Sequence, residues 1–228
     1  MKEVVEFLTL LHANNDKAWF DAHKESYKQA LSCFQEFTTR LIDGISRFDP
    51  MVAGLTVKDC TYRIYRDVRF SADKSPYKTH MGAFIAPHGK KAGYAGYYFH
   101  LEPVYDAGSW SQGSLLYAGL HCPLPQVLQS VREEIVDNGA EIEEAIHTAK
   151  GFSLDESEKL KRLPKGYAPG SPYDELLKLK EIGLVKRVPI EYVLNENLLE
   201  NVLKDFRSTC PLVSQLNRAV QYAYEEMM

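Results

Sequence analysis

The chain has 228 residues and a mass of 26.0 kDa, and 45% of its residues are hydrophobic while 25% are charged. This is the composition of an ordinary globular protein, and it excludes a disordered or collagen-like chain. Twenty-seven Lys and Arg against 31 Asp and Glu give a net charge of −4. Because dedicated nucleic-acid-binding proteins are usually basic, the overall charge argues against that class. A chain of this length can bury a full core, and we expect residues 1–228 to form a single domain.

The N-terminal stretch and the cysteines predict a cytoplasmic location. Acidic residues occupy the positions where an export signal would be apolar, so we expect no such signal. No apolar run approaches the roughly 18 residues of a membrane span, so no membrane partner is expected. The four cysteines are widely spaced and form no C-x-x-C pair, which favours reduced thiols. They are Cys33, Cys60, Cys122 and Cys210.

The first 50 residues have helical periodicity. Apolar residues from Val4 to Leu11 predict a short helix, and a three-or-four spacing from Phe20 to Phe48 predicts a longer one. Pro50 ends that pattern, because proline cannot continue a helix.

From about residue 57 to residue 120 the apolar period changes to two, with many aromatic residues and glycine-containing turns. This pattern predicts strands over residues 61–70, 79–86, 96–102 and 108–117. The short links between them favour antiparallel pairing over crossover connections. We therefore expect a central antiparallel sheet in this part of the chain.

Helical periodicity returns after Pro123, with an interruption at Asn138-Gly139. A strand-like run follows over residues 184–190, and two further helices are predicted to begin near Asn195 and Pro211. Helices first, strands in the middle and helices last predict an α+β fold in which terminal helices pack on the sheet.

Residues 62–80, here called the basic segment, carry a local excess of positive charge in an otherwise acidic chain. Five basic and two acidic residues give this segment a charge of +3, so the other 209 residues sum to −7. If residues 61–70 form a strand, Arg66 lies on its apolar face, where a guanidinium must be paired and hydrogen-bonded. The segment is therefore the principal candidate site.

One interpretation is a pocket for a small phosphorylated or carboxylated ligand. Arginine presents a planar fork to such anions, and lysine a mobile point charge. The predicted ligand-binding residues are Arg63, Arg66, Arg69, Lys74 and Lys78, with Tyr65 and Tyr77 as hydroxyl donors. Asp67 and Asp73 would orient the cations, or one of them would act as a general base if burial raises its pKa. The same parts serve a binding protein or an enzyme, so catalysis stays open.

Two other interpretations use the same residues. In the first, Asp67 and Asp73 pair with the arginines, and the segment is an ion-pair network that only stabilises the fold. In the second, the basic strip contacts nucleic acid, with the neighbouring tyrosines stacking on bases. The sequence indicates no oligomeric state.

The segment also carries a family resemblance. Residues 63–70 (RIYRDVRF) and 73–79 (DKSPYKT) closely resemble the signature of the uncharacterised family called domain of unknown function 2461. Asn14-Asn15 with Trp19-Phe20, residues 118–120, and residues 163–167 with 176–180 are similar to further blocks of that family, although Ala118 stands where a glycine is expected. The resemblance implies a bacterial-type intracellular α+β domain, and it implies no established activity.

No metal-binding, cofactor-binding or nucleophile motif accompanies these blocks. We therefore predict no bound metal and no cofactor. The best metal candidate is His100 with Glu102, two apart on one strand face, joined by His80 from a neighbouring strand. His121-Cys122 is not expected to form a nucleophile pair, because adjacent residues in an extended segment point in opposite directions.

Overall fold

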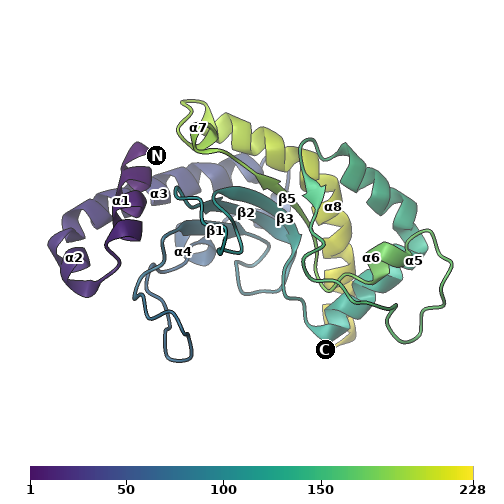
Figure 1. Ribbon diagram of the computed structural model, residues 1–228. Helices are drawn as coiled ribbons and strands as arrows, with labels where there is room; N and C mark the ends of the chain where they lie inside the picture. Colours follow the sequence, from purple (N-terminus) through teal and green to yellow (C-terminus); the bar gives the residue numbers. More distant parts are fainter. Residues whose placement is uncertain (228) are drawn as a thin grey trace.

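The computed structural model describes residues 1–227 and opens with helices (Figure 1). They are α1 (Lys2–Ala13), α2 (Lys17–Ala22) and α3 (Lys24–Ile45). The Asp16 side chain caps α2 by accepting a hydrogen bond of 2.9 Å from the Trp19 amide. The single long helix predicted from Phe20 to Phe48 is thus two helices, because the chain breaks at His23 (φ −109°, ψ 22°). A 3-10 turn, η1 (Pro50–Val52), follows.

The sheet has five antiparallel strands in the order β1-β2-β3-β5-β4. Their bounds are β1 (Met81–Ile85), β2 (Gly96–Leu101), β3 (Leu115–Leu120), β4 (Ser153–Leu154) and β5 (Ile182–Arg187). This confirms the predicted α+β class and the antiparallel pairing. Two of the five strands lie beyond residue 120, so the sheet extends past the range predicted for it.

The predicted strand over residues 61–70 is wrong. The short helix α4 (Val57–Cys60) comes directly before this range. Residues 61–70 themselves form an irregular loop with single bridges at Thr61 and Tyr65. Short polar side chains explain the failure, because Asp67 and Asp73 accept hydrogen bonds from backbone amides two residues later, at 3.3 and 2.9 Å. Such local bonds stabilise turns in place of a strand ladder.

Helices α5 (Pro125–Thr148), α6 (Asp174–Leu177), α7 (Ile190–Val193) and α8 (Leu198–Glu226) complete the fold. Asn138 has non-helical angles inside α5 (φ −128°, ψ 27°), which confirms the predicted interruption. Pro211 lies within α8 and does not begin a helix, so that prediction is wrong. Buried residues on both sides of it, from Val202 to Val220, keep the helix continuous despite the lost backbone hydrogen bond. No helix within residues 1–227 is long and apolar enough to cross a membrane.

The two faces of the sheet have different cover. On one face, Phe99 packs on Phe37 of α3 and Tyr97 on Phe206 of α8, with ring centroids 4.9 and 5.4 Å apart. Figure 1 shows α3 and α8 running along that side of the sheet. The alternate residues of β2, among them His100, point to the other face, because side chains alternate along a strand. Loop residues cover part of that face, since Tyr62 packs on Tyr98 and Trp110 on His100 with ring centroids 6.5 and 5.1 Å apart.

Candidate functional site

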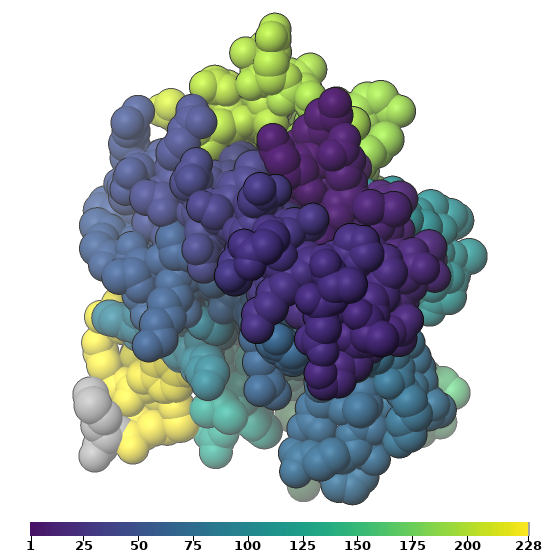
Figure 2. Space-filling model, turned by 90° about the vertical axis from the view of Figure 1, so that its left-hand side faces the viewer, coloured from purple at the N-terminus to yellow at the C-terminus, as the bar shows by residue number. Residues whose placement is uncertain are grey.

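The basic segment leaves the body of the molecule as a projecting loop. Figure 1 shows it hanging below the sheet between α4 and β1, and Figure 2 shows it as the blue protrusion below the N-terminal helices. Phe70 at its tip has 97% of its surface exposed. The loop is tied to the N-terminal helices by Asn15, whose side chain donates to the Tyr77 carbonyl at 2.9 Å and accepts from the Tyr77 amide at 3.2 Å.

Three of the five predicted cations are already engaged within the loop. Arg66 forms an ion pair with Asp73 and donates to the Ser75 carbonyl at 3.2 Å. The Arg69 guanidinium donates twice to Asp67, at 2.9 and 2.6 Å. Lys74 donates to the Val68 carbonyl at 3.0 Å. The pairs of Asp67 and Asp73 with arginines that the ion-pair interpretation expects are therefore present, and these cations do not converge on one concave surface.

Asp67 and Asp73 do not meet the condition set for a general base. Both carboxylates are exposed, and both have a pKa below the ordinary value of an aspartate. Hydrogen bonds from Arg69 lower the pKa of Asp67, and hydrogen bonds from Ser75 and then Arg66 lower that of Asp73. The required rise by burial is absent, because neither carboxylate is buried.

The two predicted hydroxyl donors lie beside the N-terminal helices. The Tyr77 ring is buried and stacks on Phe20 with centroids 3.9 Å apart. Tyr65 is half-exposed and packs against the same two rings, 6.0 Å from Phe20 and 5.5 Å from Tyr77. Both rings therefore help to dock the loop.

Arg63 and Lys78 lie elsewhere, around Tyr62. The Lys78 and Lys90 ammonium nitrogens lie 5.5 and 5.8 Å from the centre of the Tyr62 ring. Arg63 and Lys58 line the same groove as Tyr62. We call Lys58, Arg63, Lys78 and Lys90 the cation cluster. Within residues 1–227 none of the four forms an ion pair with a carboxylate.

The cation cluster borders an open groove of about 680 Å³ between α3 and residues 56–63. Glu36 is the acidic residue that lines it. The nearby Asp59 carboxylate is held by Thr56, whose amide donates to it at 2.8 Å. Burial, and then the charge of Arg63, lower the pKa of Lys78. The cluster is therefore an excess of positive charge next to a concave surface.

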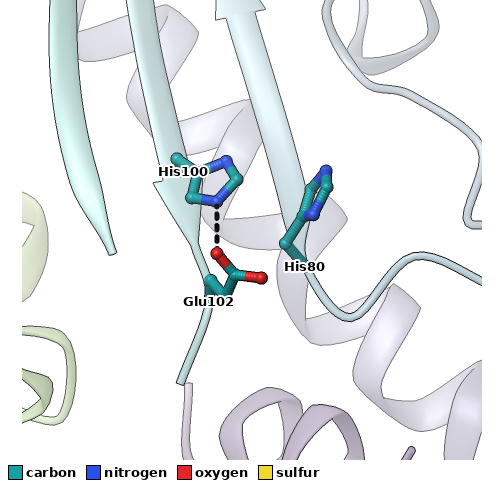
Figure 3. A group of neighbouring side chains, drawn as sticks. All are labelled: His80, His100 and Glu102. Carbon is teal, nitrogen blue, oxygen red and sulfur yellow. Dashed lines mark hydrogen bonds and ion pairs between the residues drawn. The ribbon is translucent and has the colours of Figure 1, made fainter. Parts of the chain in front are cut away.

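A second group of polar side chains lies on the loop-covered face of the sheet (Figure 3). Gly82 of β1 pairs with His100 of β2, so the antiparallel register brings His80 opposite Glu102 on the same face. One ligand atom from each of His80, His100 and Glu102 lies within 4.8 Å of the others. We call these three residues the His–Glu cluster. The structure thus assembles the three residues that the sequence offered as its best metal candidate.

The Glu102 carboxylate is buried and has several hydrogen-bond donors. His100 Nε2 lies 3.5 Å from Oε2, Ser109 donates to Oε2 at 3.2 Å, and Ser111 donates to the same oxygen. Thr79 donates to Oε1 at 3.2 Å. Burial alone would raise the pKa of Glu102, but the hydrogen bonds from His100 and Ser111 outweigh it and lower the pKa to about 2. The carboxylate is therefore ionised at neutral pH.

The two histidines differ in their surroundings. His100 is fully buried, and its Nδ1 lies 2.8 Å from the Tyr98 hydroxyl. His80 is part-buried, and its ring has no hydrogen-bond partner among residues 1–227. Burial, and then the neighbouring His100, lower the pKa of His80 to about 3. Since Lys78 also contributes to this shift, the His–Glu cluster and the cation cluster are electrostatic neighbours.

Comparison with known proteins gives one match. The family described as "Conserved hypothetical protein (DUF2461)" matches residues 3–214. The chain belongs to the DUF2461 family. No curated protein and no solved structure gave a match to it. The resemblance expected from residues 63–79 is therefore confirmed, and the family description names no activity.

A further cluster lies at the far end of β3 in this DUF2461 protein. His121 Nδ1 lies 2.6 Å from the Glu181 carboxylate, and the Cys122 thiol donates to the same carboxylate at 3.3 Å. Cys122 also lies 3.5 Å from His121 Nε2. The expectation that these neighbours point apart is wrong, because Cys122 has a left-handed backbone (φ 47°) and not an extended one. We call His121, Cys122 and Glu181 the thiol cluster.

Sequence reasoning missed two members of the cation cluster. Lys58 and Lys90 lie 32 residues apart, and the Lys90 ammonium donates to the Lys58 carbonyl. The Lys90 amide also donates to the Asp59 carbonyl at 2.9 Å. No motif in the sequence signals this contact, because it depends on how the loop after β1 folds back on α4.

Proposed function

We propose that this DUF2461 protein binds a small phosphorylated or carboxylated ligand at the cation cluster. One observation supports the proposal above all. Lys78 and Lys90 lie over the Tyr62 ring, Lys58 and Arg63 line the same groove as Tyr62, and none of the four forms an ion pair among residues 1–227. Like charges held close together repel, so an arrangement of this kind gains stability when an anion binds between them.

The groove supplies a place for that ligand. Arg63 provides a guanidinium fork at its edge, and Tyr62 provides an apolar wall with a hydroxyl. Arg66 and Arg69 are less suited to the role, because each is already paired with a carboxylate in the loop. Lys74 is also less suited, because it donates to the Val68 carbonyl of the loop and, unlike Lys78 and Lys90, makes no contact with the Tyr62 ring. We therefore assign the binding role to Arg63 and Lys78 from the predicted set, with Lys58 and Lys90 added.

The test is a thermal-shift screen on metal-free, dialysed protein with orthophosphate, nucleotides, sugar phosphates and dicarboxylates. A ligand at a hundred times its dissociation constant adds about 2.7 kcal/mol, which raises the melting temperature of a chain of this size by roughly 5–10 °C. The double variant Arg63→Gln/Lys78→Gln is expected to lose the shift. The matched control Lys161→Gln/Arg162→Gln removes the same charge from exposed positions outside the groove. It is expected to keep the rise in melting temperature.

An absence of response to every anion, with a lower melting temperature in Arg63→Gln/Lys78→Gln, would overturn the proposal. It would favour the interpretation in which the charged residues only stabilise the fold.

Nucleic acid is the second candidate, and the exposure of Tyr62 favours it specifically. Tyr62 is 45% exposed and has two ammonium nitrogens 5.5 and 5.8 Å from its ring centre, which suits stacking on an unpaired base next to a phosphate. With four cations engaged, the slope of log affinity against log salt should be about −3 for a single strand. Oligonucleotide binding with that slope, lost in Tyr62→Ala, would favour this candidate over a small ligand.

A further inference from the structure

We propose that His80, His100 and Glu102 bind a divalent transition-metal ion of the zinc type, with one coordination position open to the anionic ligand. The metal site stands on its own geometry. Only the assignment of the open position to the anion rests on the proposed function.

The donor set suits such an ion. Two imidazoles and one carboxylate, with a fourth position for water or substrate, form a recurrent arrangement in catalytic zinc sites. His100 lies on β2, Glu102 directly follows the last residue of that strand, and His80 directly precedes β1, opposite Glu102 in register. Because each proposed ligand lies on a strand or directly next to a strand end, the paired strands β1 and β2 fix its position more precisely than a long loop would.

The distances are close to those that coordination requires. Ligand atoms at about 2.0–2.2 Å from a tetrahedral ion lie about 3.3 Å from one another. The His100 Nε2 to Glu102 Oε2 distance is 3.5 Å, and the atom offered by His80 lies within 4.8 Å of both. Since the His80 ring has no hydrogen bond to break among residues 1–227, rotation of its side chain can close the remaining distance.

The residues that hydrogen-bond to the proposed ligands resemble those that orient the ligands of metal sites. A ligating histidine usually binds a polar group through its other ring nitrogen, and here the Tyr98 hydroxyl lies 2.8 Å from His100 Nδ1. Gly82 makes this contact possible, because a Cβ atom there would lie 2.4 Å from the Tyr98 hydroxyl. The Ser109, Ser111 and Thr79 hydroxyls fix the carboxylate in the same way.

One side of the cluster is accessible. His100 and Glu102 are buried, whereas His80 is part-buried and Trp110, whose ring lies 5.1 Å from His100, is 66% exposed. The Tyr98 ring also contacts Tyr62 of the groove at 6.5 Å. Lys78 is two residues before His80 in the chain, so an anion held by Lys78 beside Tyr62 would lie next to the His–Glu cluster.

The charges around Glu102 favour a bound cation over a His–Glu cluster that only stabilises the fold. Apart from the imidazoles, the donors to Glu102 within residues 1–227 are neutral hydroxyls. A buried carboxylate held mainly by hydroxyl groups gives a divalent cation an opposite charge to bind.

The test is titration of dialysed protein with Zn²⁺ by calorimetry and with Co²⁺ by absorption spectroscopy. The thiol cluster is a competing site, so the measurements use the His121→Gln/Cys122→Ser background. We expect one ion per chain and Co²⁺ ligand-field bands without a thiolate charge-transfer band. His80→Gln, His100→Gln and Glu102→Gln should each weaken binding by more than about 100-fold, and Tyr98→Phe by about 10–100-fold.

His12→Gln, at an exposed position on α1, is the matched control and should bind as the background protein does. His80→Gln is the decisive variant, because His80 has no hydrogen-bond partner among residues 1–227 and its loss leaves the fold intact. Circular dichroism verifies that fold. Unchanged Zn²⁺ affinity in folded His80→Gln, or binding only when Cys122 is present, would overturn the inference.

The two proposals fail separately. Metal binding without any anion response in the metal-free or the Zn²⁺-loaded protein would overturn the proposed function and leave the metal site standing. An anion response in the metal-free protein without any metal binding would overturn the metal site and leave the proposed function standing.

Discussion

The His–Glu cluster and the thiol cluster contain similar residue types at opposite ends of β3. The first lies at the ends of the paired strands β1 and β2, and its His100 and Glu102 are buried, with four side-chain donors around the Glu102 carboxylate. The second lies after the end of β3, where His121 and Cys122 are exposed. The register of a strand pair fixes the positions of its side chains. In an exposed turn, water competes with the side chains for hydrogen bonds and weakens their ion pairs. Burial and the number of hydrogen-bond donors, more than residue type, therefore distinguish a candidate functional site from a surface contact.

The largest predicted difference is in stability. Glu102→Ala should lower the free energy of unfolding by about 3–5 kcal/mol, because it leaves buried partners without their carboxylate. Glu181→Ala should lower it by less than about 1 kcal/mol, because its partners are exposed. Urea denaturation of both variants measures the difference. Equal losses would mean that the two clusters do not differ in the way described.

A smaller effect is expected at Gly82. Gly82→Val places atoms where the Tyr98 hydroxyl and ring now lie, at 2.4 and 2.7 Å from the position of the new Cβ, and should cost about 1–3 kcal/mol. The cost should fall in a Tyr98→Ala background, which a double-mutant cycle measures. Gly108→Ala, at an exposed position, is the control. Strict additivity between positions 82 and 98 would rule out the contact as the cause.

The smallest effect concerns thiol reactivity and its pH dependence. The hydrogen bond to Glu181 raises the pKa of Cys122 above its ordinary 9.0, so less reactive thiolate is present at a given pH. Glu181→Gln should lower that pKa and speed alkylation of Cys122 several-fold at mildly alkaline pH. Cys60, buried and with its pKa raised to about 12 by burial, should stay unmodified in the folded protein.

Iodoacetamide labelling followed by peptide mass spectrometry separates the four cysteines. A slower reaction of Cys122 in Glu181→Gln would contradict this description of the thiol cluster.

Much of the fold could be predicted from the sequence, because apolar periodicity determines which face of an element is buried. The α+β class, the pairing of the strands near residues 81–85 and 96–101, and the break at Asn138 follow from period and turn residues. Pro211 could not be placed correctly, because packing on both sides of it keeps α8 continuous.

The candidate site was less predictable, for a different reason. Alternation over residues 61–70 resembles a strand, but Asp67 and Asp73 bind nearby amides and turn the chain into a loop. The Tyr62 environment depends on Lys90, whose position is determined by loop packing and by no local pattern. By contrast, His100 and Glu102 could be placed on one face by their two-residue spacing alone.

The functional surface that we propose is the sheet face that carries the His–Glu cluster, next to the cation cluster. The most direct test of this proposal is an anomalous difference map at the zinc edge, from crystals of the full chain grown with stoichiometric Zn²⁺ and orthophosphate. We expect a peak bound by His80, His100 and Glu102, with phosphate density between that peak and Lys78. A zinc peak only at His121, Cys122 and Glu181, with no phosphate near Tyr62, would contradict it.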